Sequence, residues 1–267
     1  MDQNVPEELI DAGRGYEALF VPALFEPWTE HLVELAGVCE GSRVLDVACG
    51  TGVLARSALA KAGANGRVVG VDAGPGMLVA AQELEPTIDW ILCGAEDLEF
   101  DDAAFDCVIS QFGMMFFDDR KKSAEEMFRV LRPGGSLAVA VWRSVDHNPA
   151  YADIISVLEE HVGHTAADSL RLPFSLGNPD EVTAVLESWI APVIDWTPRI
   201  AYFYAIGGEN ESEKTQALER QAQGRGGNCS AQGRAAGRGE PSDRPAGSCT
   251  QCLEGVLSRR WCGRFPG

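Results

Sequence analysis

Short apolar runs alternate with longer amphipathic segments between residues 43 and 142 of this 267-residue chain. The apolar runs cover 43–48, 67–71, 88–93, 105–110 and 136–142, and helical periodicity occupies 53–63, 75–84 and 119–131. Strands that are apolar throughout are typical of a parallel sheet covered on both faces and joined by right-handed crossovers. The alternation therefore predicts an α/β fold with a doubly wound, mostly parallel sheet.

Helical patterns flank this region on both sides. Apolar residues recur at three- and four-residue steps over 7–37, where Pro22 and Pro27 predict a division into at least two helices. Asn148-Pro149 and Asn178-Pro179 each place an N-cap residue before a helix-initiating proline. Residues 193–204 could supply one more strand or hairpin. We therefore expect an N-terminal helical cap at 1–38, an α/β domain at 39–145, and a helical insert with an edge strand at 146–205.

The composition changes abruptly after residue 205. Residues 207–267 hold 12 of the 29 glycines, and apart from Lys214 their basic residues are all arginine. This segment has no usable periodicity, so we expect a disordered tail at 206–267. Arginine-rich composition also resembles out-of-frame translation of GC-rich coding sequence. We therefore hypothesise that the reading frame was lost near residue 205.

The net negative charge of the chain disfavours nucleic acids and anionic membranes as partners. The formal net charge is −18, and with 9 basic against 7 acidic residues in 205–267 the first 204 residues carry −20. Such a surface repels phosphate backbones and anionic lipid. The N-terminus has no apolar signal-peptide core, and no run approaches the roughly 18 apolar residues of a membrane span. We expect a cytoplasmic protein that acts on a small molecule and binds no nucleic acid; the oligomeric state stays open.

A glycine-rich turn, Ala48-Cys49-Gly50-Thr51-Gly52, ends the first predicted strand. Such a turn lets backbone approach a ligand at the carboxyl edge of a sheet. A dinucleotide fingerprint would need G-x-G-x-x-G, but Ala55 stands where the third glycine belongs. Asp46, four residues before Gly50, suits a cofactor that carries an ammonium and a sulfonium better than one with a pyrophosphate.

Further polar or glycine-rich motifs follow at the ends of later strands. Asp72 ends the second strand, where a carboxylate can accept hydrogen bonds from both ribose hydroxyls of an adenosine. The other motifs are 94–97 (Gly-Ala-Glu-Asp), 110–112 (Ser-Gln-Phe) and 131–135 (Leu-Arg-Pro-Gly-Gly). Each motif alone is weak, but their order along the chain is specific.

In this order the motifs resemble those of class I S-adenosylmethionine-dependent methyltransferases, over residues 40–145. The resemblance is to the small-molecule group that includes the ubiquinone and menaquinone C-methylating enzymes, and it implies a Rossmann-like fold and S-adenosylmethionine as methyl donor. By this resemblance one group of residues borders the methionine part of the cofactor, a second holds the adenosine, and a third faces the methionyl end. These groups are Asp46, Ala48, Gly50, Thr51 and Gly52; Asp72, Ala73, Met77, Ala95 and Glu96; and Ser110, Gln111 and Phe112.

The acceptor pocket is expected beneath the N-terminal helices (Tyr16, Phe20, Trp28) and residues 145–190. His147 follows the fifth strand directly and is the best candidate general base, although a histidine at this position more often caps a helix or faces solvent. The run 112–117 could be core packing or pocket wall. No metal is expected, because Cys249-x-x-Cys252 is a single C-x-x-C unit.

Two other functions remain open. One is a nicotinamide-dependent oxidoreductase on a similar sheet, which the missing third glycine disfavours. The other is a protein that binds S-adenosylmethionine without catalysis, or a damaged methyltransferase-like chain, which the altered tail favours.

Overall fold

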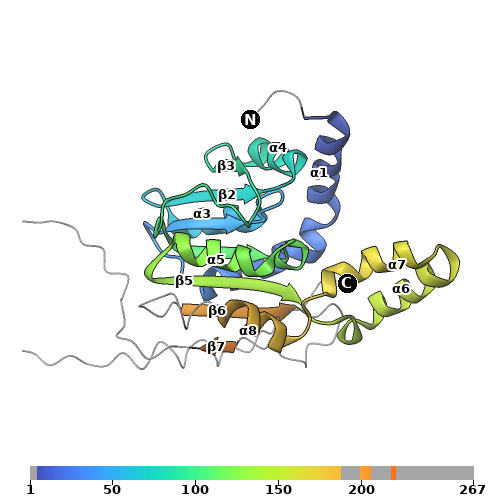
Figure 1. Cartoon of the computed structure of the whole chain (residues 1–267). Helices are drawn as coiled ribbons and strands as arrows, with labels where there is room; N and C mark the ends of the chain where they lie inside the picture. Colours follow the sequence, from blue (N-terminus) through green and yellow to red (C-terminus); the bar gives the residue numbers. More distant parts are fainter. Residues whose placement is uncertain (1–4, 188–198, 206–217, 221–267) are drawn as a thin grey trace, which may run out of the picture. The chain divides into compact units, whose positions relative to one another are not determined.

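The strands of the computed structural model form one sheet, and the structure describes residues 5–187, 199–205 and 218–220. The strand order is β3-β2-β1-β4-β5-β6-β7, in which every neighbouring pair is parallel except β6 with β7 (Figure 1). The strands are β1 (Arg43–Val47), β2 (Arg67–Asp72), β3 (Asp89–Leu92), β4 (Phe105–Gln111), β5 (Leu131–Trp142), β6 (Arg199–Ala205) and β7 (Leu218–Arg220). The expected α/β fold with a mostly parallel sheet is confirmed.

Helices precede the sheet, connect its strands and follow β5. They are α1 (Glu7–Leu19), the π-helix η1 (Val21–Phe25), α2 (Glu26–Leu35), α3 (Val53–Ala62), α4 (Pro75–Leu84), α5 (Arg120–Val130), α6 (Pro149–His161), α7 (His164–Arg171) and α8 (Pro179–Glu187). Three short 3-10 turns are η2 (Met114–Phe116), η3 (Val145–His147) and η4 (Leu172–Phe174). Among these described helices, none is long and apolar enough to cross a membrane.

The order of the strands places the functional edge of the sheet. From β1 the chain moves outward through α3 and α4 to β2 and β3, then returns to β4 beside β1 and continues the other way to β5. Because parallel crossovers are right-handed, α3 and α4 cover one face and α5 covers the opposite face. Ligands bind such sheets at the carboxyl ends of the strands, where the order reverses between β1 and β4.

The central strands form the core. Leu45, Val108 and Val139, on β1, β4 and β5, are completely buried. These strands are apolar throughout, as the sequence predicted, because helices cover both faces of the sheet. The sheet therefore gives the loops at its carboxyl edge a rigid base.

Prolines lie in the first turns of several helices, and two of these helices are preceded by an asparagine. Pro22 lies in the first turn of η1 and Pro27 in the first turn of α2, where a missing amide hydrogen removes no helical bond. At α8, Asn178 Oδ1 accepts a hydrogen bond from the Asp180 amide. Asn148 occupies the N-cap position of α6, but its side chain makes no capping bond and donates instead to the carbonyls of Arg143 and Ser144.

The C-terminal part of the sheet consists of two strands, β6 and β7. Strand β6, which covers the second half of the strand or hairpin expected at 193–204, runs parallel to β5, and β7 runs antiparallel to β6. Residues 193–198 of that expectation, and the tail apart from β7, lie outside the described residues, as does Cys249-x-x-Cys252. All described residues belong to one compact unit, Met1–Asn228. The four segment boundaries expected from the sequence remain predictions.

Candidate cofactor site

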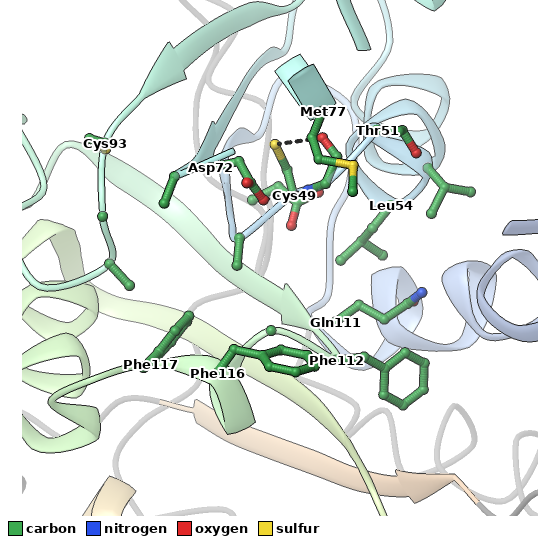
Figure 2. Close-up of a pocket in the computed structure, with 18 of the residues that line it drawn as sticks. Cys49, Thr51, Leu54, Asp72, Met77, Cys93, Gln111, Phe112, Phe116 and Phe117 are labelled. Atoms are coloured by element: carbon green, nitrogen blue, oxygen red, sulfur yellow. Dashed lines mark hydrogen bonds between the residues drawn. The ribbon is translucent and has the colours of Figure 1, made fainter. Parts of the chain in front are cut away.

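A cavity of about 450 Å³ opens at the carboxyl ends of β1, β2 and β4. Eleven of the thirteen residues predicted to hold the cofactor line it: Asp46, Ala48, Gly50, Thr51, Asp72, Ala73, Met77, Ala95, Glu96, Gln111 and Phe112. Figure 2 shows Cys49, Asp72 and Met77 on one side of it, and Phe112, Phe116 and Phe117 on the other. Its volume is within the range of small-molecule sites, roughly 300–1,000 Å³.

The backbone that borders the cavity is strained. Ala48 and Phe112 adopt positive φ angles of 58° and 54°, which residues with a side chain rarely do. Gly50 has a φ of 56°, and a Cβ built on it would meet nothing nearer than the Tyr16 ring at 3.9 Å. Strained residues of this kind cluster at functional sites, where surrounding structure holds them in place. Here two such residues border the same cavity as Gly50, which leaves room for a ligand to approach the backbone.

Asp46 is the most buried carboxylate of the site. Its Oδ2 has no hydrogen-bond partner among the described residues. Burial raises the pKa of Asp46 well above its ordinary value, and the nearby Asp72 charge raises it further. A buried acceptor without a donor is costly to maintain, so its presence beside a cavity marks a place for a ligand donor or cation.

Asp72 connects two turns at the same edge. Its Oδ2 accepts from the Gly50 amide at 2.8 Å, and its Oδ1 accepts from the Gly74 amide at 2.7 Å. Burial raises the pKa of Asp72, and the two backbone donors partly offset that increase. Each carboxylate oxygen has a second lone pair, so Asp72 can still accept from ligand hydroxyls.

The electrostatic character of the cavity is negative. Of the described residues that line it, Asp46, Asp72, Glu96 and Asp118 are acidic, and none is Lys, Arg or His. Burial also raises the pKa of the Cys49 thiol, and it raises the pKa of the Cys93 thiol to about 11, so both thiols are neutral near pH 7. A cationic ligand would therefore be favoured over an anionic one.

Aromatic rings enclose the end of the cavity beside β4 and β5. Tyr16 of α1 stacks on Phe25 of η1 at 5.3 Å between ring centroids, and Phe25 packs against Phe112 at 5.7 Å. Phe112 in turn stacks on Trp142 at 4.2 Å, with an angle of 9° between the rings. The Gln111 amide donates to the Phe25 carbonyl at 3.0 Å, which ties η1 to the end of β4. The N-terminal helices thus supply an apolar wall to this site.

Three predicted site residues do not line the cavity. A Cβ at Gly52 would lie 2.2 Å from the Trp90 ring, so this glycine admits a core tryptophan. Ser110 is completely buried, and its hydroxyl has no hydrogen-bond partner among the described residues. His147 is exposed and its Nδ1 lies 2.9 Å from Ser144 Oγ. Its assignment as general base remains a prediction.

The sequence motifs did not predict every residue that lines the cavity, and they left the role of the run 112–117 open. Phe116 and Phe117 line the cavity, whereas Met114 and Met115 between them and Phe112 are buried in the core, so the run 112–117 serves both purposes. Phe25 lines the cavity although no motif marked it. Of the expected cover, Tyr16 lines the cavity, whereas Phe20 and Trp28 do not.

Glu96 holds the loop after β4 in place. Its Oε1 accepts from the amides of Asp118 and Asp119 at 3.1 and 3.3 Å. Because Glu96 and Asp118 both line the cavity, this contact closes its border between the loop after β3 and the start of α5.

The strand order β3-β2-β1-β4-β5, the strained turn after β1 and the carboxylate after β2 agree with the resemblance of the sequence to class I S-adenosylmethionine-dependent methyltransferases. A solved structure from Methanococcus maripaludis, assigned to the S-adenosyl-L-methionine-dependent methyltransferases, has the same fold with a TM-score of 0.50 and 18% identity. It covers 70% of this chain and 87% of its own.

The chain belongs to the ubiE/COQ5 methyltransferase family, whose model matches residues 19–169, and S-adenosylmethionine is the methyl donor of that family. A ubiquinone/menaquinone biosynthesis C-methyltransferase from Proteus mirabilis is 37% identical over 118 residues, which are 42% of this chain and 47% of the relative. A demethylmenaquinone methyltransferase from Renibacterium salmoninarum is 37% identical over 135 residues, 51% of this chain and 54% of that protein. The chain thus spans about half the length of these curated relatives.

Proposed function

We propose that this chain transfers the methyl group of S-adenosylmethionine to a small-molecule acceptor by in-line displacement. The observation that carries the proposal is the acidic cavity at the carboxyl edge, whose described lining contains four carboxylates and no basic side chain. An ammonium and a sulfonium gain free energy in such a field, whereas a pyrophosphate loses it.

The residues present fit this cofactor. The unpartnered Oδ2 of Asp46 can accept from an ammonium, and Asp72 can accept from ribose hydroxyls. Gly50 leaves room for close approach of a ligand to the backbone. Ala95, Glu96 and Met77 line the cavity; Ala95 and Glu96 would border the adenine of a bound cofactor, and Met77 would pack against its adenosine.

The bound cofactor supplies a methyl group that is already activated by its sulfonium. The chain's own contribution is to hold the reactants in line, an effect worth up to roughly 7–11 kcal/mol in favourable cases. The rings of Phe25 and Phe112 exclude water from one side of the cavity. Tyr16 has its pKa raised mainly by burial, so it stays neutral and can donate one hydrogen bond.

The names of the relatives indicate which acceptor to test first. Both curated relatives above are named for quinone methylation, and one of them for methylation at carbon. An electron-rich ring carbon is therefore the first acceptor to screen, with tritiated methyl transfer as the readout. A general base is required only if the acceptor must lose a proton. His147 is the residue to substitute for that question.

Calorimetric titration with S-adenosylhomocysteine tests the proposal. We expect micromolar binding, at least about tenfold weakening by Asp72→Ala, and no binding of NADH. Preferential binding of NADH would favour the oxidoreductase alternative. Tight cofactor binding without methyl transfer to any screened acceptor would favour the non-catalytic alternative. A folded sample that bound neither ligand would contradict the proposal.

A further inference from the structure

Helix α1 is fixed to both helices that follow the cofactor-binding turns. Against α4 it packs closely, because a Cβ at Gly13 would lie 2.7 Å from the Gly76 carbonyl oxygen. Figure 1 shows α1 beside α4, next to the ends of the strands. Arg14 adds two hydrogen bonds to Glu83 of α4, at 3.1 and 2.7 Å. One turn further along the helix, α1 contacts the turn between β1 and α3 through Glu17.

Glu17 makes this second attachment with both carboxylate oxygens. Its Oε2 accepts from the Thr51 hydroxyl at 2.5 Å, and its Oε1 accepts from Arg56 at 2.7 Å. Arg56 also donates to the Thr51 carbonyl at 2.6 Å, which closes a three-residue cluster. The Glu17 and Arg56 side chains are only 21% and 24% exposed, so solvent screens this ion pair less than it screens the surface pairs.

The cluster of Glu17, Thr51 and Arg56 bears on two residues that line the cavity, Tyr16 and Thr51. Tyr16 precedes Glu17, and its ring lies 3.9 Å from the position of a Cβ on Gly50. Thr51 follows Gly50 directly and its hydroxyl is directed at Glu17. The Glu17–Thr51 contact therefore joins the residue next to Tyr16 to the residue next to Gly50.

We propose that Glu17 is a positioning residue that holds the glycine turn and Tyr16 in the cofactor-binding arrangement, and that the Thr51 hydroxyl acts through Glu17 and does not touch the cofactor. This inference rests on the proposed function of the cavity. Without the contact, the turn and α1 populate other arrangements, and the apparent affinity falls with the fraction that remains competent to bind.

A double-mutant cycle on the affinity for S-adenosylhomocysteine separates the two roles of Thr51. Glu17→Ala and Thr51→Val should each weaken binding about tenfold, and the double variant should be no weaker than the poorer single variant, because both remove the same contact. Thr51→Ser keeps the hydroxyl and should bind as the unmodified protein does. Additive losses of about a hundredfold in the double variant would overturn the inference, since Thr51 would then contact the cofactor directly.

Glu83→Ala is the matched control. It removes an equally bidentate attachment of the same helix, but to α4 and away from the cavity. We expect it to leave cofactor affinity unchanged at a temperature where all variants are folded. An equal loss of affinity in Glu83→Ala would mean that Glu17 only anchors the helix.

Hydrogen exchange of the cofactor-free protein keeps this test separate from the proposed function. Glu17→Ala should speed exchange of the amides at 50–52, and Glu83→Ala should not. Unchanged exchange in Glu17→Ala would overturn the inference even if the cofactor binds. Failure of the unmodified protein to bind S-adenosylhomocysteine would overturn the proposed function, whereas exchange would still report whether Glu17 holds the turn.

Discussion

The two edges of the sheet use the same residue type in opposite ways. At the amino edge, Asp106 accepts from the Arg43 amide at 2.7 Å and forms ion pairs with Arg43 and Arg132. At the carboxyl edge, Asp46 is buried and Asp72 is partly buried, and among the described residues neither is paired with a basic side chain; Asp72 accepts only from the backbone amides of Gly50 and Gly74. The pKa of Asp106 is lowered by its arginine partners and by the Arg43 amide, which outweigh its partial burial, whereas the pKa values of Asp46 and Asp72 are raised by burial.

The difference shows which edge serves stability and which serves binding. A carboxylate with a lowered pKa stabilises the folded chain near neutral pH, and one with a raised pKa destabilises it. Residues that destabilise the free protein persist where a ligand compensates them. Among the described residues, the carboxylates at the carboxyl edge therefore have no basic partner and are available to a cationic ligand. At the amino edge, Asp106 is already paired with arginine.

Of the substitutions considered, Asp46→Asn should change stability and cofactor affinity the most, and it tests whether the carboxyl edge serves binding. It removes a buried carboxyl group whose ionisation the folded chain disfavours, so we expect a cofactor-free protein that melts higher, by about 2–4 °C for each kcal/mol recovered. Affinity for S-adenosylmethionine should fall by about a hundredfold, because a charge-assisted contact with the ammonium is lost. Differential scanning calorimetry and titration calorimetry measure the two results. A variant that is less stable and binds normally would show that Asp46 is purely structural.

Asp106→Asn should have the reverse profile. It weakens two ion pairs and a hydrogen bond from a backbone amide, so we expect a loss of about 1–2 kcal/mol in the free energy of unfolding. Urea denaturation measures that loss. Cofactor affinity should not change, because Asp106 lies at the opposite edge of the sheet; a change would mean that the two edges are coupled.

The pH dependence of binding sharpens the comparison. A bound cation stabilises the ionised forms of Asp46 and Asp72, so binding lowers their raised pKa values and releases protons. Affinity should therefore fall as the pH falls through those raised values, by up to about tenfold per pH unit for each proton released. Titration calorimetry in buffers of different ionisation enthalpy counts the protons. Asp46→Asn should reduce that count, and an unchanged count would assign the protons elsewhere.

Stability should respond to pH with opposite signs at the two edges. The contribution of Asp106 is present above its unfolded pKa and is lost as the pH falls through its lowered folded value. Asp46 and Asp72 weaken the fold as the pH rises from their unfolded values through their raised folded values. Only the first of these two effects contributes to acid unfolding.

The sequence predicted the sheet and most of the cavity because both depend on local patterns. Apolar runs predicted the strands at 43–48 and 105–110, and the rule that ligands bind at strand ends brought Asp46, Asp72 and Gln111 together. These residues are set by position along a strand, which a sequence displays directly.

Contacts between distant elements were not predictable in this way. Phe25 reaches the cavity because η1 joins α1 to α2, and Glu17 reaches Thr51 across 34 residues. Gly52 shares its motif with Gly50, yet it faces Trp90 from a different strand and so admits a core ring instead of a ligand. A motif identifies the turn, but tertiary packing decides which of its residues face the cavity.

Asp89→Asn should have the smallest effect and sets the scale for the others. Asp89 pairs with Arg67 at 2.9 Å on the amino edge, but the two side chains are 57% and 66% exposed. Exposed ion pairs are weak because solvent screens them, so we expect a change within about 0.5 kcal/mol in unfolding and none in cofactor affinity. Urea denaturation beside Asp106→Asn makes the comparison. A loss of unfolding free energy as large as that of Asp106→Asn would show that ion pairing alone stabilises the amino edge. The partial burial of Asp106 and its hydrogen bond from the Arg43 amide would then add nothing.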